Sequence, residues 1–229
     1  MIMKNLFALS LVVISLGSAF AQQTETRSVG QYSGVRAAEG IDVYLVKGTK
    51  ESVRVEVTGT SVSDVITEVS GSYLKIHMRD GNYRGRVSVK VYATYVKLNK
   101  LSASSAANIF SDGTISTNEL EISASSAGSV EITIAAGDVE VSASSAGEVE
   151  LKGTAASLDV DVSSAGEVDA YDLEAGRVEA RASSAGSIKL SVKDELDAHA
   201  SSGGSIRYRG NPNKSMTNSS SGGSVKKSN

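Results

Sequence analysis

The tetrapeptide Ser-Ser-Ala-Gly recurs at a nearly constant interval through the second half of this chain. Four copies are identical, and three more are close variants. The first serines of the seven copies are Ser104, Ser125, Ser144, Ser163, Ser183, Ser201 and Ser220. Consecutive copies are therefore separated by 18 to 21 residues. A short and nearly fixed period of this kind indicates a solenoid or another repeat array.

Each period also contains two segments in which apolar and polar side chains alternate. In one period these segments are residues 120–124 and 130–134. Strict alternation predicts a strand with one buried face, so each period predicts two strands of about five residues and two tight turns. Because the same turn returns at the same phase, a parallel β-helix fits this pattern better than an antiparallel meander does. Equivalent residues would then stack about 4.8 Å apart, and the helix would be right-handed, since parallel crossovers almost always are.

The last residue of the tetrapeptide forms a column of glycines in this arrangement. Its members are Gly128, Gly147, Gly166, Gly186, Gly204 and Gly223. Glycine adopts a positive φ angle without a steric penalty from a β-carbon. The sequence therefore predicts that these glycines occupy turn positions with positive φ.

The first 21 residues have the pattern of a signal peptide. Lys4 provides a positive start, residues 6–16 are mostly apolar, and Ala19-Phe20-Ala21 is typical of a cleavage site. This pattern predicts export, whether to the periplasm, the outer surface or the medium. The chain contains no cysteine, which excludes a disulfide scaffold and a cysteine-linked lipid anchor. No other apolar run is long enough to predict a transmembrane span.

The remaining chain divides into three parts by pattern. Residues 22–100 are rich in alternating segments but lack the repeat, and they predict a strand-rich cap for the N-terminal end of the helix. Residues 101–225 form the predicted coils, and residues 226–229 form a short basic tail that we expect to be frayed. Without residues 1–21 the formal net charge is −4, because Lys4 is lost from a chain of net charge −3. An acidic chain does not favour nucleic acid as a partner.

The chain resembles a known Bacteroidetes family, described as "putative auto-transporter adhesin, head GIN domain". The resemblance rests on G-I-D-V-Y-L-V-K-G at residues 40–48, V-R-V-E-V at 53–57 and L-N-K-L-S-A-S-S-A at 98–106, followed by the Ser-Ser-Ala-Gly coils. It covers nearly all of the mature chain. It implies an all-β fold similar to a β-helix and an adhesin-like role, and it supplies no catalytic residues.

The outward positions of the predicted coils contain a column of acidic residues. We call this column the acidic ladder, and its members are Glu121, Glu140, Asp159, Glu179 and Asp197. Stacked carboxylates favour either a solvated face that keeps the protein soluble or a site for a basic partner or a divalent cation such as calcium. The glycine- and aspartate-rich nonapeptide of calcium-binding β-rolls is absent. No other cofactor is predicted.

A second candidate site lies in the N-terminal segment. The sequence predicts a hairpin loop between two strands at residues 80–85. Tyr83 and Arg84 lie in this loop, and Arg86 follows it directly. Tyrosine and arginine are frequent at binding hot spots, although a solvated hairpin tip would have the same composition.

Three classes of function are compatible with these patterns. The first is a non-enzymatic exported binding protein, adhesin-like, which contacts a glycan or an envelope or host protein through the β-helix surface. The second is a structural or self-assembling envelope protein, for which a homo-oligomer is expected. The third is a polysaccharide-active β-helix enzyme, since stacking brings carboxylates together; the coils, however, contain few aromatic residues and no nucleophile beside a base. The first class is our prediction.

Overall fold

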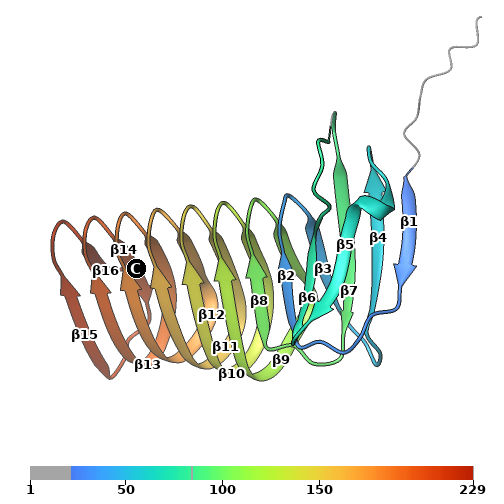
Figure 1. Ribbon diagram of the computed structural model, residues 1–229. Helices are drawn as coiled ribbons and strands as arrows, with labels where there is room; N and C mark the ends of the chain where they lie inside the picture. Colours follow the sequence, from blue (N-terminus) through green and yellow to red (C-terminus); the bar gives the residue numbers. More distant parts are fainter. Residues whose placement is uncertain (1–21, 84, 229) are drawn as a thin grey trace, which may run out of the picture.

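The computed structural model describes residues 22–83 and 85–228, which form a β-solenoid of about seven turns without an α-helix. The signal peptide predicted over residues 1–21 lies outside the described residues. In Figure 1 the chain rises at the front, crosses over at the top and descends at the back while it advances to the left, which is a right-handed path. The described residues contain no helix long and apolar enough to cross a membrane.

Each central coil is one long strand that bends back on itself. These strands are β9 (Asn108–Ala124), β10 (Ser129–Ala143), β11 (Glu148–Val162), β12 (Glu167–Ala182) and β13 (Ser187–Ala200). The prediction of two short strands and two tight turns per coil is therefore wrong at the second turn. Neighbouring coils bend in the same way, so their parallel ladder continues around the bend, from Ser129↔Glu148 to Ala143↔Val162 in one pair. Other pairs take up extra residues there as register shifts.

The one tight turn of each coil is the Ser-Ser-Ala-Gly segment. In the turn at residues 125–128, the Gly128 N–H donates to the Ser125 carbonyl oxygen at 2.8 Å. Ser126 has φ of 50° and Ala127 has φ of 59°, so both central residues are left-handed, as in a type I′ turn. Gly128 itself does not have positive φ. The prediction for the glycine column is therefore wrong, because the left-handed positions belong to the serine and the alanine.

The glycine is required for a different reason. A β-carbon on Gly128 would lie 2.5 Å from the carbonyl oxygen of Ala103 in the preceding coil. The turns are also joined to one another, since the Ala127 N–H donates to the carbonyl oxygen of Ser145 at 3.1 Å. The repeat thus specifies both the turn and the close approach of successive coils.

The N-terminal segment extends the same sheet by further rungs. Its strands are β1 (Gln23–Arg27), β2 (Gly34–Ala37), β3 (Asp42–Lys47), β4 (Ser52–Thr58), β5 (Val65–Ser70), β6 (Tyr73–Met78), β7 (Ser88–Tyr95) and β8 (Lys100–Ala103). On one side β2 lies between β8 and β6, and on the other β3 lies between β9 and β7, all in parallel. β4 and β5 then run antiparallel to β7 and β6, and β1 pairs with the outer side of β4. The domain boundary at residue 100 stays a prediction.

The segment at residues 80–85 is not a hairpin loop. β6 pairs with β2 and β5, whereas β7 pairs with β3 and β4. The two strands therefore lie on different sides of the solenoid. Alternation in the sequence identified the strands correctly, but it does not reveal which strand is the hydrogen-bonding neighbour.

The C-terminal end is formed by β14 (Ser205–Arg209), β15 (Lys214–Ser219) and β16 (Ser224–Lys227). The expectation of a frayed tail from residue 226 is wrong for the described residues. Lys226 pairs with Arg207 in the ladder of β14 and β16. The Ser228 N–H also donates to the Tyr208 carbonyl oxygen at 2.8 Å. Backbone pairing therefore orders this end of the chain.

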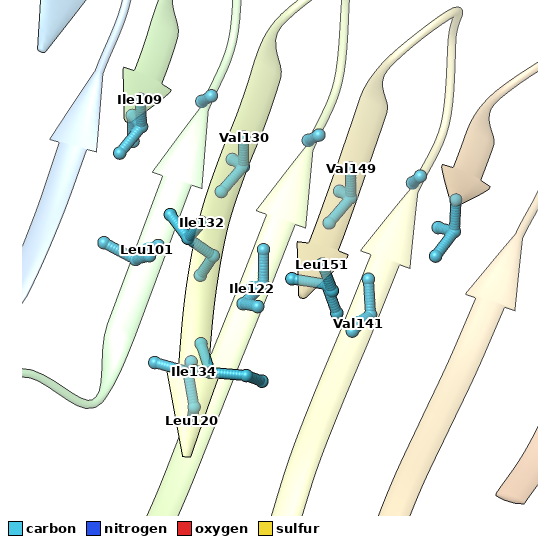
Figure 2. Close-up of a cluster of buried hydrophobic side chains, with 14 of the residues drawn as sticks. Leu101, Ile109, Leu120, Ile122, Val130, Ile132, Ile134, Val141, Val149 and Leu151 are labelled. Carbon is cyan, nitrogen blue, oxygen red and sulfur yellow. The ribbon is translucent and has the colours of Figure 1, made fainter. Parts of the chain in front are cut away.

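The core is a stack of inward-pointing side chains, one set per coil (Figure 2). One inward column, just after the tight turns, is fully buried throughout, and it consists of Ile109, Val130, Val149, Val168, Ile188 and Ile206. Each such side chain contributes about 1.5 to 3 kcal/mol by leaving water. Because this thin core fills the solenoid with apolar side chains, the chemistry available for function lies on the outward positions.

Candidate binding faces of the solenoid

Each coil presents two outward faces, separated by the tight turn. The first face consists of the outward side chains before the turn, and the second face of those after it. On the first face the strand register pairs Glu121 with Glu140, Glu140 with Asp159, Asp159 with Glu179 and Glu179 with Asp197. The predicted stacking of the acidic ladder is therefore confirmed, with neighbouring residues about 4.8 Å apart.

A shallow groove runs beside the acidic ladder. It lies between the ladder and the next outward column, which contributes Glu119, Asp138, Ser157, Arg177 and Glu195. One part of the groove has a volume of about 320 Å³. A second part of about 370 Å³ shares Ser157 and Asp159 with the first. The groove thus follows the solenoid axis over several coils. Around Glu140 it is bordered by carboxylates on both sides, while Lys100 lines one end and Arg177 lines the part beyond Asp159.

Cations reach the ladder near its two ends. Lys100 forms an ion pair with Glu121, and this hydrogen bond, together with the carboxylate charge, raises the pKa of Lys100 above its ordinary value. Toward the other end, Arg181 contacts Glu179 and lies 3.8 Å from a carboxylate oxygen of Asp159.

Glu140 lies between these two regions. Among residues 22–83 and 85–228 it forms no ion pair, and its column neighbours Glu121 and Asp159 are also acidic. We therefore expect the negative potential over the groove to be strongest around Glu140. Like charges on neighbouring strands destabilise a sheet, and a cationic group bound at Glu140 would add to the compensation that Lys100 and Arg181 already give its neighbours.

The part of the chain that the structure describes contains no group of three or more His, Asp or Glu side chains arranged to hold a metal ion. Each carboxylate of the ladder instead lies on its own strand, and several are engaged by Lys or Arg. Binding of calcium by the ladder stays a prediction.

The second face has a column with a different charge pattern. In order along the axis its members are Glu131, Glu150, Asp169, Lys189, Arg207 and Lys226, each in register with the next. We call it the mixed column. Lys189 Nζ lies 2.8 Å from a carboxylate oxygen of Glu167 and 3.2 Å from one of Asp169, and these hydrogen bonds raise the pKa of Lys189. Lys152 Nζ similarly lies 2.8 Å from Glu150 and 3.3 Å from Glu131.

An aromatic stack continues the mixed column toward the N-terminal end, and the sequence patterns gave no prediction of it. The Tyr44 ring stacks on Tyr92 at a centroid distance of 5.2 Å and on Phe110 at 5.3 Å, and the Arg54 guanidinium lies 3.8 Å from the Tyr92 ring centroid. Phe110 occupies the same repeat position as Glu131 in the next coil. This correspondence could have placed Phe110 in the mixed column from the sequence. Because the rings stack face to face, the stack stabilises these rungs and leaves mainly ring edges at the surface.

At the second predicted site, the structure describes Tyr83 and Arg86. The Tyr83 hydroxyl donates to the carbonyl oxygen of Arg79, and its ring is partly buried against the core. Burial raises the pKa of Tyr83. Arg86 is exposed, and Arg84 lies outside the described residues. A binding role for Tyr83, Arg84 and Arg86 stays a prediction.

A comparison with family models matches residues 31–212 to the family described as "putative auto-transporter adhesin, head GIN domain". The chain belongs to this adhesin family. The resemblance noted in the sequence is thereby confirmed over most of the solenoid and its N-terminal rungs. A comparison with curated proteins finds no match.

Solved structures similar to this adhesin-family chain come from Bacteroides and Parabacteroides species. A putative adhesin from Bacteroides fragilis is 22% identical with a TM-score of 0.82, and the match covers 90% of this chain and 97% of that one. A putative adhesin from Parabacteroides distasonis is 18% identical with a TM-score of 0.68, covering 92% and 98%. A protein from the same organism named putative lipid binding protein is 20% identical with a TM-score of 0.66, covering 91% and 97%. At these identities the structures share the fold.

Proposed function

We propose that this adhesin-family chain is an exported, non-enzymatic binding protein whose first face binds a basic surface of a protein partner. The observation that carries the proposal is the groove beside the acidic ladder, which around Glu140 is bordered by carboxylates on both sides. Glu140 at its centre has acidic neighbours on both adjacent coils. The predicted signal peptide and the family description support export; periplasm, outer surface and medium are all compatible with it.

A protein partner fits the groove better than a neutral glycan does. No aromatic side chain lines either part of the groove, so it has no ring face on which a sugar could stack. A surface of lysine and arginine side chains would instead meet complementary charge, which favours rapid and salt-sensitive association.

The experiment is a binding screen with the immobilised mature chain, residues 22–229. Its three arms are a glycan array, an extract of envelope and host proteins, and lipid vesicles, the last because one structural neighbour is named a lipid binding protein. We expect selective capture of a protein with a basic surface. Selective binding of a glycan or a vesicle would replace the proposed partner, and failure in all three arms would favour the structural envelope role.

A pair of matched variants assigns any binding to the first face. Glu140→Gln with Asp159→Asn neutralises the centre of the groove, while Glu131→Gln with Glu150→Gln removes the same number of charges from the second face. We expect the first variant to lose most of the binding and the second to keep it. Equal binding by both variants would contradict the proposal.

A further inference from the structure

The mixed column has a charge order that is complementary to itself. Three acidic residues are followed by three basic residues, one per coil and in register along the axis. The sign changes between Asp169 and Lys189. If a second copy of the column is reversed about that midpoint and placed against the first, every acidic residue lies opposite a basic one.

We propose that two copies of this chain pair through their second faces with their solenoid axes antiparallel. The two-fold axis runs parallel to the strands and passes between the levels of Asp169 and Lys189. It brings each residue of the acidic half opposite a residue of the basic half in the other copy. The opposed pairs are Asp169 with Lys189, Glu150 with Arg207, and Glu131 with Lys226. Each pair occurs twice, as expected for an interface in which the same patch contacts itself.

The neighbouring columns are compatible with this arrangement. In the column before the mixed one, Glu148 aligns with Glu167 and Ser187 with Ser205. The same axis places these glutamates opposite the small serines of the other copy, whose hydroxyls are suitable donors to carboxylates.

On the other side of the mixed column, the two-fold axis brings Lys152 close to Arg209 of the other copy. Each of these cations already has a partner within its own chain. Lys152 lies 2.8 Å from Glu150, and the Arg209 guanidinium lies 3.9 Å from the Tyr171 ring centroid. The Glu150 carboxylate therefore offsets the charge of Lys152, while the Arg209 guanidinium is held against an aromatic ring.

Charge also selects the face and the orientation. With parallel axes the mixed column would place Glu131 opposite Glu131 and Lys226 opposite Lys226, and like charges at an interface are unfavourable. The acidic ladder of the first face keeps one sign from Glu121 to Asp197, so it has no self-complementary order in either orientation. The second face with antiparallel axes is therefore the arrangement that the charges favour.

The size of the patch predicts a reversible dimer. Six coils at about 4.8 Å and five residues at about 3.3 Å give a plan area on the order of 500 Å² per copy. Twice this area lies below the roughly 1,200–2,000 Å² of stable interfaces. Pairing would leave the two first faces on opposite sides of the dimer, so that a dimer could engage two partners at once.

Sedimentation velocity of the mature chain over a concentration series tests the pairing. We expect a monomer–dimer equilibrium at about 0.01 M salt, where the Debye length is about 30 Å, and monomers at about 1 M salt, where it is about 3 Å. A chain that stays monomeric at low salt and at the highest soluble concentration would overturn the proposal.

Charge exchange tests the predicted register. Glu150→Lys and Arg207→Glu should each abolish the dimer, and the two together should restore it, because the exchanged charges again oppose each other. Glu150→Lys with Lys226→Glu is the off-register control and should not restore it. Glu140→Lys on the first face should leave the dimer intact, and circular dichroism establishes that each variant is folded. Dimerisation that survives the single reversals, or that the matched double variant fails to restore, would contradict the arrangement.

Discussion

The carbonyl oxygen of Ala124 lies 2.3 Å from the position that a β-carbon on Gly147 would occupy. Real β-carbons do not approach an oxygen so closely, and the atom in the way belongs to the backbone of the preceding coil. The glycine of each Ser-Ser-Ala-Gly turn therefore sets the distance between coils. Its φ angle is unexceptional.

Gly147→Ala should destabilise the solenoid by about 1 to 3 kcal/mol, the usual cost of inserting a group into a packed site. The added methyl group must push two coils apart at a turn that is hydrogen-bonded on both sides. Chemical denaturation of the mature chain measures the effect. An unchanged unfolding midpoint would show that the turns are not stacked as described.

Ala146→Gly should stabilise the solenoid, although Ala146 is the residue next to Gly147. Ala146 has φ of 59°, a left-handed conformation that costs about 1 kcal/mol or more for a residue with a β-carbon. Gly203 and Gly222 occupy the same turn position in the last coils, also with positive φ. We expect a gain of about 0.5 to 1 kcal/mol after the entropy of the unfolded glycine is included. A loss of stability would refute the type I′ assignment.

Glu140→Gln should stabilise the fold at low salt. It removes a carboxylate that lies between Glu121 and Asp159, and relief of like-charge repulsion between strands amounts to about 0.2 to 1 kcal/mol. The gain should shrink as salt screens the charges. Glu150→Gln is the matched control, because it removes an ion pair with Lys152 and should give no gain. A similar response of both variants would argue against repulsion within the ladder.

The same ladder provides a test for a divalent cation. If calcium binds only the native chain, it should raise the melting temperature above the value in sodium chloride of equal ionic strength, and Glu140→Gln with Asp159→Asn should abolish that difference. Equal melting temperatures in the two salts would remove the acidic ladder as a calcium site.

Stability should fall at alkaline pH in part through Tyr32. This tyrosine is 4% exposed and donates to the Thr94 carbonyl oxygen at 2.7 Å, and burial raises its pKa well above the ordinary value. The unfolded chain therefore loses this proton near pH 10 while the folded chain keeps it, so stability decreases as pH rises above about 10. Tyr32→Phe should cost about 1 kcal/mol at neutral pH and weaken the alkaline decrease.

The repeat made much of the architecture predictable. A fixed period with alternating residues placed Val130 over Val149 and Glu140 over Asp159, and the strand register agrees. The repeat did not reveal which turn residues are left-handed. Glycine is expected wherever φ is positive, whereas here the neighbouring coil requires the glycine, and the left-handed positions fall to Ser126 and Ala127.

Two other features could not be derived from the pattern. The wide bend opposite the tight turn interrupts the alternation, since residues 135–138 between the buried Ile134 and Val139 are not buried. It carries no recurring tetrapeptide, however, that would distinguish a wide bend from a second tight turn. The N-terminal rungs lack the repeat, so nothing in the sequence indicated that β4 would pair with β7 in the antiparallel direction. Among the candidate binding residues, the acidic ladder followed from the period, while the stack of Tyr44 on Phe110 depended on the pairing of β3 with β9.

The measurement that tests the central claim most directly is the affinity of the mature chain for a lysine-rich peptide at low and moderate salt. The affinity is measured for two double variants. The first-face variant combines Glu140→Gln with Asp159→Asn, and the second-face variant combines Glu131→Gln with Glu150→Gln. If the groove beside the acidic ladder is the binding face, the first variant loses at least tenfold in affinity, the second loses little, and the unsubstituted chain binds more weakly as salt increases. Equal losses in the two variants would show that binding follows overall charge, and would contradict the assignment of the first face as the binding site.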